Sequence, residues 1–255
     1  MMLPLPWIAL ILGLVEGITE FLPISSTGHL ILAERLCGFT GARADVFAIF
    51  IQLGAVVAVV VEYRVKLWTS AKRLGVSVFV AFLPFATLGL IAHGWIEEHL
   101  FSPRTIAMAL IAGAVAILAV EKWKPEPRWN DTTSIGPRRA ALIGLAQCVA
   151  LWPGFSRSAA TILGGLLCGL ERKAATEFSF FLAVPTLGAA TVYSFAKNRH
   201  ELLGSDVNWL TVATLVSFLV AWASIRWLVR FVATHDLTPF AWYRIALGIV
   251  VLIAT

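Results

Sequence analysis

Six long segments of the chain are almost free of charged residues, and they set the narrowest limit on its architecture. Each approaches the roughly 17–25 residues that a helix needs to cross the hydrocarbon core of a membrane. Charged residues make up 14% of the chain, against roughly 25% in an average soluble protein. We therefore predict an all-α, polytopic membrane protein with six transmembrane helices, in which residues 1–255 form a single membrane domain. The segments cover residues 46–61, 75–96, 105–120, 176–195, 209–228 and 239–254.

Two further apolar stretches are each interrupted at a proline. Residues 1–22 end at Pro23, and residues 139–152 end at Pro153. The pieces on either side are too short to span comfortably, and the hydroxyl residues after each proline suit the cap of a new helix. Two short helices that meet at such a point form a re-entrant hairpin, which is tolerated at membrane depth only where protein or a water-filled cavity surrounds it. We predict one re-entrant helical hairpin in each half of the chain.

The two interrupted stretches also resemble each other. LGLVEGITEFLPISSTGHL in the first half matches IGLAQCVALWPGFSRSAAT in the second half. Gly13 aligns with Gly144, and after a slip of one residue Ser26 aligns with Ser156. A single match of this kind is weak, but a series of matches in the same order indicates a repeat.

Further matches follow in that order, such as the LGA sequences around Gly54 and Gly188. We infer two repeats, approximately residues 1–121 and 138–255, joined by a loop of residues 122–137. Because each repeat contains an odd number of spans, the second repeat runs in the opposite direction through the membrane. The architecture predicted here is therefore an inverted-topology repeat.

The basic residues support this arrangement. Most of them fall in loops on the same side as residues 122–137, and the positive-inside rule makes that side cytoplasmic. Both termini are then outside, the first hairpin enters from outside and the second enters from the cytoplasm. Inverted repeats with discontinuous helices place a binding site where the interruptions meet. The net charge of +5 is explained by this topology, so we expect no nucleic-acid partner.

Glu16 and Glu20 are four residues apart, so they share one face of the first short helix. Carboxylates inside a membrane are energetically expensive and are usually functional. The alternative is a structural role in which each bonds to the opposite hairpin. Glu16 aligns with the uncharged Gln147, so the acidic pair belongs to the first half alone and the predicted site is asymmetric.

Three hydroxyl residues, Ser25, Ser26 and Thr27, follow the first interruption. One of them must cap the next helix, but three hydroxyls exceed that need. His29 lies three residues beyond Ser26, close enough on a helix to share or take the proton of its hydroxyl. A lone histidine is more often a satisfied polar residue than a catalyst. Beside two glutamates and a run of hydroxyls, we favour the catalytic role.

The second interruption reads WPGFSRSAAT. Ser156 and Ser158 again suit a helix cap, and Arg157 adds a charge that is not neutralised at ordinary pH. A helix N-terminus with free N–H groups beside an arginine suits phosphate oxygens. As a structural alternative, Arg157 pairs with Glu16 or Glu20. Both roles hold together if the pair loosens when a phosphate arrives.

Carboxylates next to a bound polyphosphate would repel it unless a cation intervened. Glu16 and Glu20, with nearby hydroxyl oxygens, offer Mg²⁺ or Ca²⁺ a partial oxygen shell that phosphate could complete. We therefore expect a divalent cation as cofactor. The whole constellation suits phosphoryl transfer or hydrolysis on a substrate reached from the membrane, such as a lipid diphosphate.

These motifs resemble one known family. EGITE followed by FLPISSTGHL resembles the acidic and Ser-Ser/Thr-Gly-His segment of the bacterial undecaprenyl-diphosphate phosphatases, also called bacitracin-resistance proteins, and PGFSRSAAT resembles their P-G-x-S-R-S-x-x-T motif. IQLGA, EFSFFLAVPT and YRIALG are similar to family segments too, so the resemblance covers nearly the whole chain. It implies hydrolysis of undecaprenyl diphosphate, the C55 carrier lipid, to undecaprenyl phosphate plus phosphate for peptidoglycan synthesis.

The resemblance also implies roles for individual residues. Glu16 and Glu20 match the essential acidic pair, which is associated with divalent-metal dependence. Ser26 matches the hydroxyl proposed as nucleophile, His29 the histidine of that motif, and Arg157 the phosphate-binding arginine. The hydroxyl residues of both motifs are predicted to bind the diphosphate: Ser25, Thr27, Ser156, Ser158 and Thr161.

The family resemblance places the chain in the bacterial cytoplasmic (inner) membrane, with the site open toward the outer face. The implied partners are undecaprenyl diphosphate and membrane lipid. Gly165 and Gly169 have a small-x-x-x-small spacing, but such pairs pack helices within one chain as readily as between chains. This spacing therefore leaves a homodimer open.

A lipid-phosphate flippase or anion transporter is the alternative function. Inverted repeats with broken helices are typical of secondary transporters, and Arg157 would bind a phosphate headgroup equally well there. The additional hydroxyls, the histidine and the acidic pair favour chemistry, because binding alone does not require them. Phosphate release by the purified protein would separate the two functions.

Overall fold

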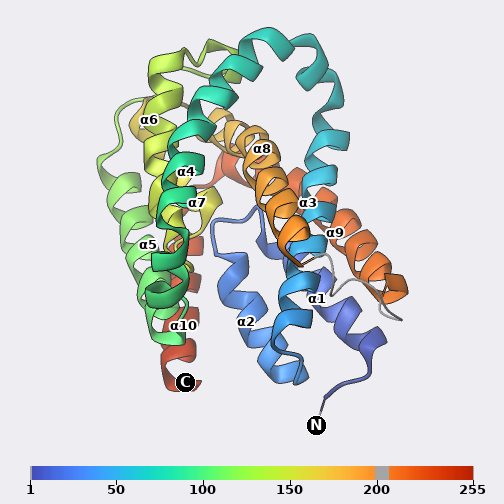
Figure 1. The fold of residues 1–255 in the computed structure, drawn as a ribbon. Helices are drawn as coiled ribbons and strands as arrows, with labels where there is room; N and C mark the ends of the chain where they lie inside the picture. Colours follow the sequence, from blue (N-terminus) through green and yellow to red (C-terminus); the bar gives the residue numbers. More distant parts are fainter. Residues whose placement is uncertain (1, 199–206, 255) are drawn as a thin grey trace.

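The computed structural model describes residues 2–198 and 207–254, and every regular element in these ranges is a helix (Figure 1). The prediction of an all-α fold is therefore confirmed. In chain order the elements are α1 (Leu5–Thr19), α2 (Ser26–Cys37), α3 (Ala42–Thr69), α4 (Ala71–Leu100), α5 (Pro103–Trp123), η1 (Thr132–Ser134), α6 (Pro137–Gln147), η2 (Cys148–Leu151), α7 (Arg157–Leu167), α8 (Arg172–Asn198), α9 (Val207–Thr234) and α10 (Thr238–Ala254).

Within the described residues, five helices are long and apolar enough to cross a membrane. They are α3 over Arg43–Thr69, α4, α5, α8 over Arg172–Tyr193, and α9. The chain is therefore a multi-pass membrane protein. The apolar helix α10 has 17 residues, which is at the lower limit for a span. The sixth transmembrane helix and the re-entrant hairpins stay predictions.

Local sequence signals explain several helix ends. The Ser102 side chain accepts a hydrogen bond from the N–H of Thr105 (3.2 Å) and so caps α5. Pro103 follows in the first turn, where its missing N–H has no partner to lose. The helix α2 ends at Gly38, whose φ of 66° lies in the left-handed region that favours glycine.

The two halves pass through the same order of elements. Each begins with a short helix, a non-helical segment and a second short helix, and each continues with two long helices and a closing helix. We call residues 20–25, between α1 and α2, the first break, and residues 152–156, between η2 and α7, the second break. The start of α1 and the end of α10 lie at the same, lower end of the molecule in Figure 1.

The first short helix of each half packs against a long helix of the other half. A Cβ atom at Gly13 of α1 would lie 2.5 Å from the carbonyl oxygen of Ala213 in α9. A Cβ atom at Gly144 of α6 would clash with the carbonyl oxygen of Ala81 in α4. Because a missing side chain lets two helix backbones approach closely, these aligned glycines interlock the two halves around the breaks.

A cluster of charges joins the halves at the end of α5. The carboxylate of Glu121 accepts hydrogen bonds from Arg172 at the start of α8 (2.7 and 3.0 Å) and from Lys124 (2.5 Å). It also accepts one from the N–H of Leu237, just before α10 (3.0 Å). One buried carboxylate therefore connects α5 to two helices of the second half.

The segment between α5 and α6 lies against the α7–α8 junction. The N–H groups of Arg128 and Trp129 donate to the carbonyl oxygen of Gly169 (2.9 and 3.2 Å). Asp131 accepts a hydrogen bond from the Thr133 side chain, which together with nearby Lys66 holds the pKa of Asp131 below its ordinary value. Asp131 therefore stays ionised near neutral pH.

Candidate active site

Each break ends at a serine that caps the following short helix. The Ser25 side chain accepts a hydrogen bond from the N–H of Gly28 (3.5 Å), and the Ser156 side chain accepts one from the N–H of Ala159 (3.2 Å). Ser25 (φ 72°) and Ser156 (φ 77°) are the two non-glycine residues with positive φ in the described part of the chain. The caps are therefore structural equivalents.

This equivalence corrects the sequence alignment at the breaks. The slip of one residue that placed Ser26 on Ser156 is wrong, because Ser25 is the cap that matches Ser156. Without the slip, Ser26 aligns with Arg157. The candidate nucleophile and the candidate phosphate ligand therefore occupy the same place, the first residue of α2 and of α7.

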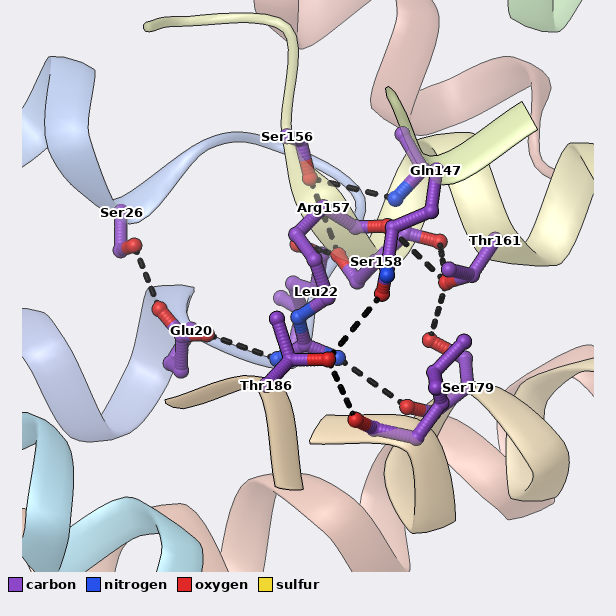
Figure 2. A network of polar contacts seen from close by, with 12 residues as sticks. Glu20, Leu22, Ser26, Gln147, Ser156, Arg157, Ser158, Thr161, Ser179 and Thr186 are labelled. Carbon is purple, nitrogen blue, oxygen red and sulfur yellow. Dashed lines mark hydrogen bonds and ion pairs between the residues drawn. The ribbon is translucent and has the colours of Figure 1, made fainter. Parts of the chain in front are cut away.

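A short chain of contacts joins these two residues. Ser26 donates its hydroxyl hydrogen to Oε2 of Glu20 (2.6 Å), and Oε1 of Glu20 accepts from Nη2 of Arg157 (2.7 Å) (Figure 2). The side chains of Glu20 and Arg157 are only 5% and 8% exposed, so this ion pair is buried. The sequence alternative in which Arg157 pairs with a glutamate is confirmed for Glu20. An acid, an alcohol and a guanidinium thus meet at one place.

Arg157 is held from a second side and keeps one donor free. Its Nη1 donates to the carbonyl oxygen of Ser179 in α8 (3.1 Å). Its Nε–H is buried and has no hydrogen-bond partner in the described part of the protein. A buried donor without an acceptor costs roughly 1–3 kcal/mol, so this N–H is suited to donate to an oxygen of a ligand.

The side chains of Ser158 and Thr161 in α7 form hydrogen bonds with other protein groups. Ser158 donates to the carbonyl oxygen of Leu22 in the first break (2.9 Å), and Thr161 donates to the hydroxyl of Ser179 (2.6 Å) (Figure 2). The first of these bonds links the first break to the first turn of α7. These contacts give both side chains a structural role, and their predicted contact with the diphosphate stays a prediction.

Glu16 lies one helical turn before Glu20, with the Glu20 N–H donating to the Glu16 carbonyl oxygen (2.9 Å). Its side chain is completely buried, and neither carboxyl oxygen has a hydrogen-bond partner within the described residues. These two unpartnered oxygens beside Glu20 could serve as ligands of a divalent cation. No group of three or more His, Cys, Asp or Glu side chains suited to a metal occurs in the part of the chain described, so phosphate oxygens would have to complete such a shell.

His29 is turned away from Ser26. Its Nδ1 lies 2.7 Å from the carbonyl oxygen of Ser25, and its Nε2 lies 2.7 Å from the hydroxyl of Tyr243 in α10. A carbonyl oxygen only accepts, so Nδ1 carries a hydrogen. Both ring nitrogens are therefore engaged by groups other than the Ser26 hydroxyl, and the nearest base to that hydroxyl is Glu20.

A cavity of about 200 Å³ lies between the two breaks. Ser156 at the end of the second break and Arg157 at the start of α7 line it, and the cavity also contacts Gln52, Phe85 and Thr186 of the long helices. Glu16, His29, Ser158 and Thr161 do not line it. From the first break and the start of α2, it is lined by Glu20, Ser25, Ser26 and Thr27.

A larger cavity of about 490 Å³ adjoins this one, because Ser26, Thr27 and Gln52 line both. It extends to Glu97 and Phe101 at the end of α4. The space beside Ser26 is therefore continuous with the end of the molecule at which α4 finishes.

Comparison with known proteins identifies the relatives of this chain. The family described as bacitracin resistance protein BacA matches residues 9–250. The chain belongs to this family. Three curated relatives cover 96% of the chain: undecaprenyl-diphosphatase of Dechloromonas aromatica strain RCB (51% identical, 92% of the relative covered), that of Polaromonas naphthalenivorans strain CJ2 (49%, 93%) and undecaprenyl-diphosphatase 1 of Chromobacterium violaceum (49%, 94%). The family resemblance seen in the motifs is thereby confirmed.

Sequence reasoning missed three kinds of residue at this site. Gln52 was a polar side chain inside a predicted span, which is a functional signal in a membrane protein. Arg244, which donates to the carbonyl oxygens of Pro23 and Gly154 in the two breaks, was a charge inside the last predicted span and offered the same signal. Thr186 and Phe85 gave no signal, because small hydroxyls and aromatic rings are common in apolar helices.

Proposed function

We propose that the chain hydrolyses undecaprenyl diphosphate to undecaprenyl phosphate and inorganic phosphate, which recycles the carrier lipid for peptidoglycan synthesis. The observation that carries this proposal is the contact of Ser26 with Glu20 and of Glu20 with Arg157 beside one cavity. A hydroxyl, a base within hydrogen-bond distance and a cationic ligand for phosphate are the groups that such a hydrolysis needs. The names of the curated relatives support the same reaction.

Ser26 is the nucleophile and Glu20 the base in this proposal. The Ser26 proton passes to Oε2 of Glu20 while Oγ bonds to the terminal phosphorus. The bond from that phosphorus to the bridging oxygen breaks, and the departing undecaprenyl phosphate takes the proton from Glu20. Water then attacks the phosphoserine, Glu20 accepts a proton from this water, and the proton returns to Ser26 as phosphate leaves.

Arg157 and the two helix starts hold the phosphates. The unpartnered Nε–H of Arg157 can donate to a phosphate oxygen. The first N–H groups of α2 and α7 add partial positive charge at the same cavity. Thr27 lines the cavity and supplies a further hydroxyl. His29 positions the backbone of Ser25 through its bond to the Ser25 carbonyl oxygen, so we assign it a supporting role rather than that of base.

Glu16 and Glu20 would hold the divalent cation, Mg²⁺ or Ca²⁺. The unpartnered oxygens of Glu16 support this assignment, and the cation would neutralise charge on the phosphate oxygens. Titration of the purified protein with the cation alone, followed by calorimetry, tests it. Glu16→Gln should weaken that binding at least tenfold, and unchanged binding contradicts the assignment.

The proposal includes a membrane arrangement. Six helices span the bacterial inner membrane, the broken pairs are re-entrant hairpins, residues 1–121 and 138–255 are inverted repeats, and the termini lie outside. The larger cavity supports an opening toward the outer face, because it leads from Ser26 to the end of α4.

The homodimer stays a prediction: a Cβ at Gly165 would lie 2.8 Å from the Ala175 side chain, so this glycine packs helices within the chain.

Phosphate release from undecaprenyl diphosphate by the protein in detergent tests the reaction. Ser26→Ala and Glu20→Gln should each lower kcat per folded molecule by about 100-fold or more, because each removes a group that acts in proton transfer or bond formation. Thermal unfolding should stay close to that of the parent protein for Ser26→Ala and fall for Glu20→Gln, which leaves the buried Arg157 without its counter-charge. His29→Gln should lower kcat less than Glu20→Gln does. A loss in His29→Gln as large as in Glu20→Gln would contradict the assignment of the base.

Two further readouts distinguish the remaining routes. Reactions quenched in denaturant at neutral pH should yield a phosphorylated peptide that contains Ser26, and phosphate on His29 or on no residue contradicts the covalent route through Ser26. Liposomes with labelled lipid test the alternative function. Movement of the lipid between leaflets without phosphate release would identify a flippase and refute the proposed hydrolysis.

A further inference from the structure

Arg244 in α10 is the largest fully buried side chain in the described part of the protein, and it lies outside the proposed chemistry. Its guanidinium donates only to backbone carbonyl oxygens. Nε donates to Leu110 (3.1 Å), and Nη2 donates to Ala109 (3.2 Å), both in α5. The remaining bonds reach the two breaks.

One bond goes to each break. Nη1 donates to the carbonyl oxygen of Pro23 in the first break, and Nη2 donates to that of Gly154 in the second break, both at 3.1 Å. These two carbonyl groups have no other hydrogen bond within the described residues. Non-helical backbone inside a membrane must be satisfied by other protein groups, and a single planar guanidinium does so for both breaks at once.

The surroundings of Arg244 are built for this guanidinium. A Cβ atom at Gly113 of α5 would clash with its Nη2, so the glycine provides the space that the head group occupies. No carboxylate forms an ion pair with Arg244 among the residues that the structure describes. An arginine without a counter-ion is costly to bury, so a role limited to filling space would be served better by an apolar side chain.

We propose that Arg244 is a positioning residue that fixes the first break relative to the second and so aligns Ser26 and Glu20 with the phosphate held by Arg157. The residue acts through the backbone of the breaks and does not touch the reacting atoms. The inference deepens the proposed function and rests on it. It predicts that disturbing Arg244 moves the catalytic groups of one half against those of the other.

The expected kinetic effect is a loss of kcat rather than of binding. A misplacement of about 1 Å at a reacting centre can lower the rate about 100-fold. Variants that disturb Arg244 keep Arg157, so substrate affinity should depend less than kcat does on the alignment of the two breaks. Arg244→Lys keeps the charge but cannot donate to four carbonyl oxygens. We expect kcat to fall about 100-fold per folded molecule, with KM changed less than about threefold.

Gly113→Ala provides a second variant that leaves Arg244 itself unchanged. The added methyl group pushes the guanidinium away from the carbonyl oxygens of Ala109 and Gly154 and should lower kcat in the same way. Gly75→Ala, in α4, is the matched control because a Cβ there meets no atom within 4 Å in the part of the chain that the structure describes. Arg230→Lys, an exposed arginine in α9, controls for the loss of a guanidinium. Both controls should keep the parent kcat.

A distance measurement tests the inference without substrate. Spin labels at Leu36 of α2 and Leu167 of α7, which are 85% and 56% exposed, report the separation of the two halves in a chain whose three cysteines are replaced by alanine. Arg244→Lys or Gly113→Ala should shift or broaden the distance distribution. If Arg244→Lys does not fold, the kcat and the distance distribution of Gly113→Ala alone test the positioning role.

The outcomes separate the two proposals. A parent protein that releases no phosphate refutes the proposed function, while the distance measurement still tests the positioning role. A lowered unfolding temperature with the parent kcat per folded molecule and an unchanged distance distribution shows that Arg244 only stabilises the fold, and it overturns the inference. An effect on KM alone also overturns it, because that would place Arg244 in substrate binding.

Discussion

Ser25 and Ser156 combine a helix cap with a backbone conformation that side chains rarely adopt. Their φ values of 72° and 77° lie where only glycine is unstrained, and such residues cost of order 1–3 kcal/mol each. Each serine recovers part of this cost because its hydroxyl satisfies an N–H at the start of the next helix. The strain lies next to Ser26 and Arg157, so it fixes the direction in which both side chains leave the backbone.

Substitutions at Ser25 should separate the stability gained from the helix cap from the stability lost through the strained φ. Ser25→Ala loses the cap, worth about 1 kcal/mol, and keeps the strained φ. Ser25→Gly also loses the cap but relieves the strain, so its stability should stay near that of the parent. Thermal unfolding in detergent should therefore rank the parent and Gly variants above the Ala variant. An Ala variant at least as stable as the Gly variant would show that φ is not strained in the folded protein.

At the residue scale, the sequence predicts the types of group better than their pairing. The motifs indicated acid, hydroxyl and guanidinium groups, and the structure joins Ser26, Glu20 and Arg157. The partner of His29 could not be predicted, because Tyr243 lies 214 residues away and helical spacing shows only neighbours on the same helix. Positive φ at two serines also has no local signal, since tertiary contacts impose it.

At the scale of elements, the predicted apolar segments identify helices but underestimate their length. The segment 46–61 corresponds to α3 and 75–96 to α4, and both helices extend for several residues at each end. Charged residues such as Arg64 continue the helix, because their long stems can lie along apolar surroundings while the charge reaches water. Hydropathy marks the part of a helix inside the membrane, not its ends.

Gly54 and Gly188, which align in the repeat, provide a test of helix packing. A Cβ at Gly54 in α3 would clash with the carbonyl oxygen of Thr214 in α9, whereas a Cβ at Gly188 meets no atom of the described residues within 4 Å. Gly54→Ala should destabilise the protein by about 1–3 kcal/mol through overpacking. Gly188→Ala should be neutral or stabilising by up to about 1 kcal/mol, because alanine favours helix.

Reversible unfolding in mixed micelles would measure both changes. Equal effects of the two substitutions would contradict the packing described here. The difference also shows why a repeat in sequence does not give equal roles to its members. Gly54 and Gly188 sit in similar sequences, but only one of them faces a close helix, and that choice depends on the whole assembly.

At the scale of the whole molecule, the interlocking of the halves follows from long-range contacts that sequence does not specify. Gly13 and Gly144 were recognised as a repeated pair, yet their partners, α9 and α4, belong to the opposite halves. The charge cluster around Glu121 likewise joins α5 to α8 and to the start of α10. Three spans per half fix the proposed direction of the second half, but only packing decides which helix covers each broken pair.

The orientation in the membrane can be tested with two exposed glutamates. Glu98, near the end of α4, and Glu126, between α5 and α6, are both exposed. Each is replaced by cysteine, singly, in a chain without its three native cysteines. In intact bacteria a membrane-impermeant maleimide should label Glu98→Cys and should label Glu126→Cys only after the membrane is opened, because the positive-inside rule places the α5–α6 segment in the cytoplasm.

The same result decides on which side the substrate enters. The larger cavity beside Ser26 ends at Glu97 and Phe101, next to Glu98, so labelling of Glu98→Cys from outside means that the space beside Ser26 opens outward. The reverse pattern would place that opening in the cytoplasm and would contradict the proposed outer-face site. The chemistry at Ser26, Glu20 and Arg157 would survive such a reversal, since it depends on how the two breaks meet and not on which leaflet they face.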